Sequence, residues 1–164
     1  MKAYCRHPFD TSLPVTISQG CGPNHTPGGA KDLVFNGIRW GEFSPGVGFV
    51  HGTPVYAIES GTVRIVRRNS PHCPDPNNCP QYDNMVLVED IDGFYTQYGH
   101  ITPDGPIQEG VSIQIGDCLG FVDNSGVTTG PHVHIGRYEP GDATTWFNRP
   151  TCDWVLPVSR GDYQ

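Results

Sequence analysis

The chain has 164 residues, of which 36% are hydrophobic and 16% charged, so it can bury a core and is not a disordered segment. Its formal net charge is −7, and its basic residues are scattered apart from Arg64, Arg67 and Arg68, which argues against a nucleic-acid partner. No apolar run is long enough to cross a membrane, and residues 1–7 lack the apolar stretch of a secretory signal. We expect one compact domain over residues 1–164.

The predicted elements are short. With 21 glycines and 16 prolines in no repeating period, the chain should contain many turns, and we expect long ordered loops over the first fifty residues and over 70–81. Alternating and β-branched segments predict strands at 54–58, 61–66, 84–89, 93–98 and 112–115. No segment carries a sustained helical apolar stripe, so any helix should be short. The sequence therefore predicts an all-β fold, an antiparallel sandwich or open barrel with little helix.

The tail after Pro140 contains Trp146, Phe147 and Trp154, which predicts that it docks on the core. The six cysteines are an even number without Cys-x-x-Cys spacing, so disulfides are favoured over a zinc knuckle, with buried free thiols as the alternative. Cys73 and Cys79 flank a short Pro- and Asn-rich loop and are the expected pair. Three pairings stay open for the other four: Cys5, Cys21, Cys118 and Cys152. Disulfides would place the protein outside the reducing cytosol.

Two histidine motifs carry the strongest chemical signal. His132 and His134 lie two residues apart, so on a strand both imidazoles would point to the same face. His100 follows Tyr98 at the end of a predicted strand, where it can face the same cleft. Alone, each motif is also compatible with ordinary surface or core histidines. No Gly-x-Ser-x-Gly elbow is present, so nothing supports a serine nucleophile.

The order of these motifs between about Val15 and Glu139 resembles that of the lysostaphin/LytM-type zinc peptidases. The segments that carry the resemblance are Gly52-Thr53-Pro54-Val55, Tyr98-x-His100, Gly110-x-Ser112, Gly116-Asp117 and Thr129-Gly130-Pro131-His132-x-His134. The resemblance implies an antiparallel β-sheet fold with a long groove, where zinc and two histidines cleave cross-links of bacterial peptidoglycan. It also implies that His134 is a zinc ligand and that His100 and His132 are the catalytic histidines that do not bind the metal.

The remaining two ligands of this family come from a His-x-Gly-x-Asp segment. The best match is residues 35–40, where Phe35 and Arg39 stand at the ligand positions. Phe35 has no lone pair and Arg39 is a permanent cation, so we expect no ordinary zinc site and no cofactor. Zinc is expected only if other residues rebuild the site. Glu42 and His51 are possible substitute ligands, and His25 with Asp32 lies earlier in the chain.

Three functions remain open at this point. The leading hypothesis is an inactive peptidoglycan-directed domain, in which Arg39 binds a carboxylate of a stem peptide, with Tyr98, His100 and His132 as neighbouring donors. An ion pair of Arg39 with Glu42 is the structural alternative. The second function is an active zinc endopeptidase with substitute ligands. The third is a structural subunit of an envelope complex, an extracellular filament or a phage tail tip, partnered by other protein subunits. All three imply an extracellular, envelope or virion location.

Overall fold

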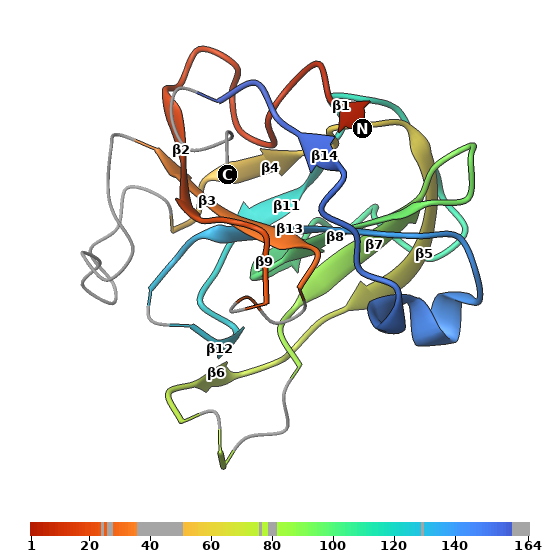
Figure 1. The fold of residues 1–164 in the computed structure, drawn as a ribbon. Coiled ribbons are helices and arrows are strands. Elements are labelled where there is room, and N and C mark those ends of the chain that lie inside the picture. Colours follow the sequence, from red (N-terminus) through yellow and green to blue (C-terminus); the bar gives the residue numbers. More distant parts are fainter. Residues whose placement is uncertain are drawn as a thin grey trace.

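The computed structural model describes residues 1–23, 25, 28–35, 51–75, 77–78, 82–128 and 130–158. Short strands joined by turns make up most of it (Figure 1). The helical exception in this part of the chain is η1 (Ala143–Asn148), a 3-10 segment capped by the Asp142 side chain, which accepts a hydrogen bond from Thr144 N. No helix among the described residues is long and apolar enough to cross a membrane.

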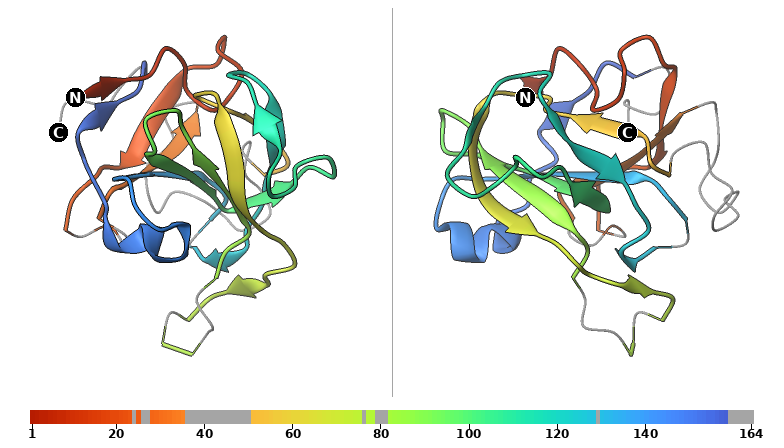
Figure 2. Two further views of the ribbon diagram at one scale, coloured as in Figure 1. Left: turned by 90° about the vertical axis from the view of Figure 1, so that its right-hand side faces the viewer. Right: turned by 180° about the vertical axis from the view of Figure 1, so that it is seen from behind.

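A seven-stranded sheet forms the body of the molecule, with the order β10-β5-β7-β8-β13-β3-β2. Every neighbouring pair in it is antiparallel. Its strands are β2 (Val15–Gln19), β3 (Ala30–Phe35), β5 (Gly61–Arg67), β7 (Met85–Glu89), β8 (Tyr95–Gly99), β10 (Ser112–Ile113) and β13 (Val133–Tyr138). The sheet places segments from the beginning, middle and end of the chain side by side (Figure 2).

Three smaller sheets complete the fold. A three-stranded antiparallel sheet has the order β4-β11-β9, and the parallel pairs β1-β14 and β6-β12 lie apart from it. The strands are β1 (Lys2–Ala3), β4 (Pro54–Tyr56), β6 (His72–Cys73), β9 (Ile101–Pro103), β11 (Cys118–Val122), β12 (Gly126–Val127) and β14 (Trp154–Val155). The β6-β12 pair projects from the lower edge in Figure 1.

The large sheet is packed on both faces. Val86 and Val88 of β7 belong to the main core with residues of the small sheet, such as Val55 and Leu119. Met85, Leu87, Tyr95, Tyr138 and Trp146 form a second apolar cluster. Because alternate residues of a strand point to opposite faces, β7 reads as a continuous apolar run instead of an alternating one.

The all-β antiparallel prediction is confirmed, and each of the five predicted strands is present with ends shifted by a few residues. The expectation of loops through the first fifty residues is wrong for β2 and β3, which extend the large sheet. β3 carries Lys31 and Asp32, two charged residues that do not follow a strand's apolar pattern. Both are buried, at 3% and 2% exposure, because each has a specific polar partner.

A disulfide joins Cys21 to Cys152 across 131 positions of sequence. Cys5 and Cys118 are free thiols, so two of the four cysteines left open by the sequence do not pair. Cys73 is disulfide-bonded, and its predicted partner Cys79 lies outside the described residues. Trp154, two residues after Cys152, is buried and donates from its indole nitrogen to Gly29 O, so the tail is tied to the loop before β3.

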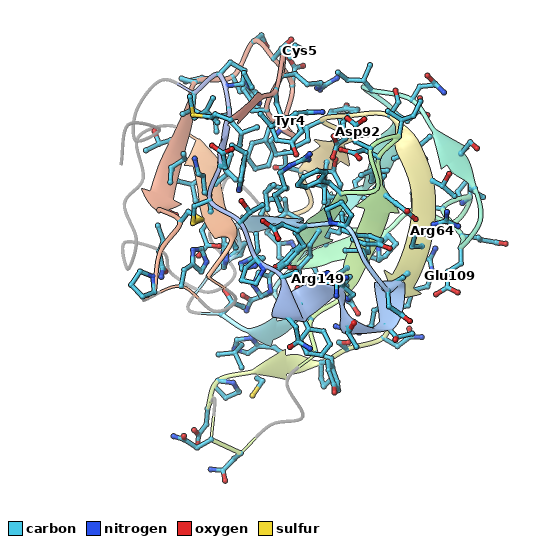
Figure 3. The ribbon with its side chains drawn as sticks, turned by 45° about the vertical axis from the view of Figure 1, so that its right-hand side comes forward. Tyr4, Cys5, Arg64, Asp92, Glu109 and Arg149 are labelled. Atoms are coloured by element: carbon cyan, nitrogen blue, oxygen red, sulfur yellow. A yellow bond between two sulfur atoms is a disulfide. The ribbon has the colours of Figure 1, made fainter. Side chains whose placement is uncertain are left out.

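A buried ionic network around Arg137 holds the C-terminal part of β13 on its core-facing side. Arg137 donates to Asp90 Oδ2 at 3.0 Å and to the Tyr4 hydroxyl at 2.6 Å, and its Nη1 lies 3.4 Å from Glu59 Oε1. Figure 3 shows Tyr4 reaching inward from the N-terminal segment. Burial raises the pKa of Glu59, although Thr96 and Arg137 counteract the effect. The network ties the first residues of the chain to the strand that carries His134.

We predict that replacing Cys21 and Cys152 together by Ser lowers the free energy of unfolding by about 2 to 5 kcal/mol, because the bridge closes a very long loop. Urea unfolding of the double variant against the wild type measures the difference. Cys5→Ser, which removes an exposed free thiol, is the control and should unfold as the wild type does. Equal stability of the double variant and the wild type would contradict the assignment.

We predict a pH signature for Glu59. A carboxyl group whose pKa is raised in the folded state favours folding while it is protonated, and this contribution is lost as the pH rises through the folded pKa. The unfolding free energy of the wild type should therefore fall relative to that of Glu59→Gln as the pH rises above 4.5, the ordinary value for this carboxyl. Paired denaturation series from pH 4 to pH 7 test the sign, and a relative gain by the wild type would refute it.

Candidate metal centre and catalytic histidines

Strand pairing brings the first two site residues together. In the register of β3 and β13, Asp32 lies opposite His134, and Asp32 Oδ1 is 3.0 Å from His134 Nδ1. Phe35, which the sequence match places at a ligand position, pairs through its backbone with Val15 at the other edge of β3. Arg39 and Glu42 lie outside the described residues.

His25 reaches the same carboxylate from the loop before β3. Its Nε2 is 3.1 Å from Asp32 Oδ1, while its Nδ1 is 3.0 Å from Gly20 O and its backbone N donates to Gly22 O. A carbonyl only accepts, so the proton of neutral His25 sits on Nδ1 and the Nε2 lone pair faces Asp32. Two lone pairs cannot face each other at this distance without a proton or a metal ion between them.

His132 enters from the turn that precedes β13. Its Nδ1 lies 2.8 Å from Gly130 O, and Thr128 braces the turn by accepting from Gly130 N at 3.1 Å. The carbonyl again fixes the proton of the neutral ring on Nδ1, and Nε2 lies 3.4 Å from Asp32 Oδ1. His132 therefore presents a basic nitrogen beside the carboxylate.

His100 completes the group from the turn between β8 and β9. Its φ of 57° is in the left-handed region, and Asp83 Oδ2 stabilises that turn by accepting from His100 N at 3.0 Å. The ring Nδ1 donates to Ser125 O at 2.7 Å, which leaves Nε2 unprotonated in the neutral ring. The ring centre lies 4.6 Å from that of His132 and 5.8 Å from that of His134.

The electrostatics centre on one buried carboxylate. Burial alone would raise the pKa of Asp32, but the three surrounding imidazoles outweigh it and hold that pKa well below its usual value. Burial would lower the pKa values of His25 and His132, yet the Asp32 charge raises both. For His100, burial followed by the nearby His132 lowers the pKa to about 4.

The donor set fits a divalent zinc ion. His25 Nε2, Asp32 Oδ1 and His134 Nδ1 converge, and both nitrogens lie 3.0 to 3.1 Å from that one oxygen, close to the ~3.3 Å separation expected of tetrahedral ligands with ~2 Å bonds. Three imidazole nitrogens thus crowd around one carboxylate oxygen, which has two lone pairs. His134 Nε2 is also buried with no hydrogen-bond partner among the described residues. These residues suit a metal ion better than a proton network.

The other sequence-based site residues lie elsewhere or are not described. Tyr98 is 0% exposed in the main core, where its hydroxyl accepts from Ile58 N, so the expectation that it contacts a ligand is corrected. Its side chain points to the face of β8 opposite that of Gly99, the residue paired with His134. His51 is exposed. The sequence offered His25 and Asp32 only as an alternative pair of zinc ligands, because seven positions separate them, three more than in His-x-Gly-x-Asp.

The profile of Peptidase family M23 matches residues 44–145, more than half of the chain. The chain belongs to peptidase family M23. The matched segment contains His100, His132 and His134 but begins after Asp32. Among curated relatives of this M23 chain, the DD-carboxypeptidase/endopeptidase Mpg of Neisseria meningitidis is 31% identical over 83 residues, covering 51% of the chain and 16% of Mpg. The peptidoglycan DD-endopeptidase ShyA of Vibrio cholerae is 30% identical over 83 residues, covering 51% of the chain and 17% of ShyA.

Solved structures support the M23 fold. A zinc-containing peptidase from Vibrio cholerae superposes with a TM-score of 0.60 at 23% identity. The match covers 95% of the present chain and 41% of the Vibrio peptidase. The catalytic domain of lysostaphin from Staphylococcus simulans superposes with a TM-score of 0.56 at 19% identity, covering 85% and 88%. The M23 chain spans less than a fifth of the length of Mpg and ShyA, so the similarity concerns one part of those proteins.

We predict that His25→Ala and Asp32→Asn each lower zinc affinity by more than the roughly 10–100-fold that loss of an outer-shell partner costs, because each removes a direct donor. Competition with a chromophoric chelator measures the affinity. His51→Ala is the control, since that exposed side chain is the substitute ligand suggested by the sequence. Unchanged affinity in both ligand variants, or a loss in His51→Ala, would refute the assignment of the ligands.

Proposed function

We propose that the chain is a zinc-dependent peptidase that cleaves peptide bonds in peptidoglycan. The observation that carries this proposal is the convergence of His25, Asp32 and His134 beside His100 and His132, whose Nδ1 atoms lie on main-chain carbonyls. The names of Mpg and ShyA, a DD-carboxypeptidase/endopeptidase and a peptidoglycan DD-endopeptidase, support the substrate class. The expectation of an inactive domain rested on Phe35 and Arg39 as replaced ligands, whereas the position of Asp32 beside His134 supports a different set of ligands.

Zinc bound at this site would polarise the scissile carbonyl and lower the pKa of the attacking water. His25, Asp32 and His134 would hold the ion, and each of them is at most 6% exposed. His132 and His100 each keep Nδ1 on a main-chain carbonyl, so each can take or return a proton at Nε2. A neutral ring can accept the proton of the attacking water at Nε2. The other ring donates toward the charge on the carbonyl oxygen only when it is protonated at both nitrogens, a form that the raised pKa of His132 favours.

The disulfide supports an extracytoplasmic location. Cys21–Cys152 ties the loop that presents His25 to the C-terminal segment, so the metal site depends on a bond that a reducing cytosol would break. We therefore propose that the protein works in the cell envelope or outside the cell, where peptidoglycan is accessible. Carboxylate binding by Arg39 remains a prediction, because that residue lies outside the described part of the chain.

The experiment is digestion of purified peptidoglycan, followed by release of new amino groups. We expect wild-type activity that a chelator abolishes and zinc restores. His132→Ala and His100→Ala should each lower the rate by about 10²–10⁴-fold, the range for a lost proton-transfer group, while zinc content stays at the wild-type level. His72→Ala, an exposed histidine on β6, is the control. Zinc-loaded wild type that releases no amino groups, or histidine variants with full activity, would refute the proposal.

A further inference from the structure

Three arginines at the end of β5 are bonded very differently. Arg68 is committed to the fold, because it donates to main-chain carbonyls of Pro103, Asp104 and Ile107. Arg64 is paired with Glu89 Oε2. Arg67 makes one hydrogen bond within the described residues, a long one of 3.5 Å to Asp83 O, and its Nη1 is 3.6 Å from Asp83 Oδ1. Most of its five N–H donors therefore have no partner among the described residues.

Arg67 lies on the same face of the large sheet as the metal centre. Directly paired residues of antiparallel strands point to the same face, so the register can be followed across the sheet. This row of partners runs Arg67↔Met85, Met85↔Gly99, Gly99↔His134 and His134↔Asp32. Asp32 and His134 therefore share one face of the sheet with Arg67.

Asp83 joins Arg67 to the catalytic histidines. One carboxylate oxygen accepts from His100 N and lies 3.9 Å from His100 Nδ1, while the other faces Arg67. Gly99 makes this approach possible, because a Cβ there would collide with Asp83 Oδ2. One side chain thus separates the guanidinium from His100, a spacing that a few residues of extended peptide can bridge.

The Tyr82 ring lies against the Arg67 guanidinium. The Arg67 guanidinium carbon lies 4.5 Å from the centre of the Tyr82 ring, and the ring is 60% exposed. Stacking fixes the plane of the guanidinium while leaving its edge open, and the Arg67 side chain remains 29% exposed. A planar fork held in this way is preorganised for a carboxylate.

We propose that Arg67 and Tyr82, anchored by Asp83, form a subsite that binds a carboxylate of the peptide substrate on the His100 side of the metal centre. The inference rests on the proposed peptidase function and specifies its substrate: stem peptides with a free carboxylate within a few residues of the scissile bond. A guanidinium has enough donors to bind the substrate while it stays near Asp83. The subsite then sets substrate preference and leaves the bond-breaking step to the histidines.

The test uses two stem peptides that differ only in a free or amidated carboxylate. We expect wild-type kcat/KM to favour the free carboxylate by roughly tenfold to a hundredfold, the range for a charge-assisted hydrogen bond. Arg67→Gln should lose that preference, so that its kcat/KM values for the two peptides become equal within error. Arg64→Gln is the matched control, since it removes an arginine of the same strand that is paired with Glu89, and it should keep the preference. Matching zinc content and thermal unfolding will show that the variants are intact.

The test separates failure of the Arg67 subsite from failure of the proposed peptidase function. If the wild type cleaves both peptides equally, or if Arg67→Gln keeps the preference, the subsite is refuted while the peptidase function stands. If the wild type cleaves neither peptide, the proposed function fails, and calorimetric binding of the same two peptides decides the subsite. Tighter binding of the free carboxylate by the wild type but not by Arg67→Gln supports the subsite, and equal binding refutes it.

Discussion

The site depends on the pairing of Asp32 with His134 across β3 and β13. That register buries a carboxylate at 2% exposure and places one of its oxygens within 3.4 Å of three imidazole nitrogens. A buried carboxylate is stable only when it is paired, so the loop of His25 and the turn of His132 are held against it by necessity. The disulfide and the bonds of Trp154 to Gly29 and Thr151 secure the loop that reaches the carboxylate from outside the sheet.

The two faces of β13 have different roles. Residues at alternate positions point to opposite faces, so His134 points to the metal centre and Arg137 to the buried network with Tyr4, Glu59 and Asp90. That network holds the strand on its core side, where Lys2, 3.3 Å from Glu59 Oε2, supplies a second cation beside the two carboxylates. The other face instead gathers several imidazoles around one carboxylate, a donor set that fits a divalent cation.

The sequence predicted the all-β antiparallel fold and singled out three histidines of the candidate site, because short alternating strands and the motifs around His100, His132 and His134 are local features. It did not predict β3, since Lys31 and Asp32 interrupt the apolar pattern and their partners, the Trp154 carbonyl and His134, are more than a hundred positions away. Only pairing in space shows that these charges are satisfied. Tyr98 was misplaced for the complementary reason: closeness to His100 in sequence does not put both side chains on one face.

The spacing of His25 and Asp32 shows what such a site tolerates. A fixed motif is required when the backbone between two ligands sets their geometry. Here Asp32 is set by the β3-β13 register, whereas His25 is set by its bonds to Gly20 and Gly22 and by the disulfide beside them. Extra residues between the two can loop out at a small entropic cost, because closure entropy grows only slowly with loop length. The motif can thus be lost from the sequence while its donor side chains keep their positions. A search for metal ligands should therefore consider strand register before sequence spacing.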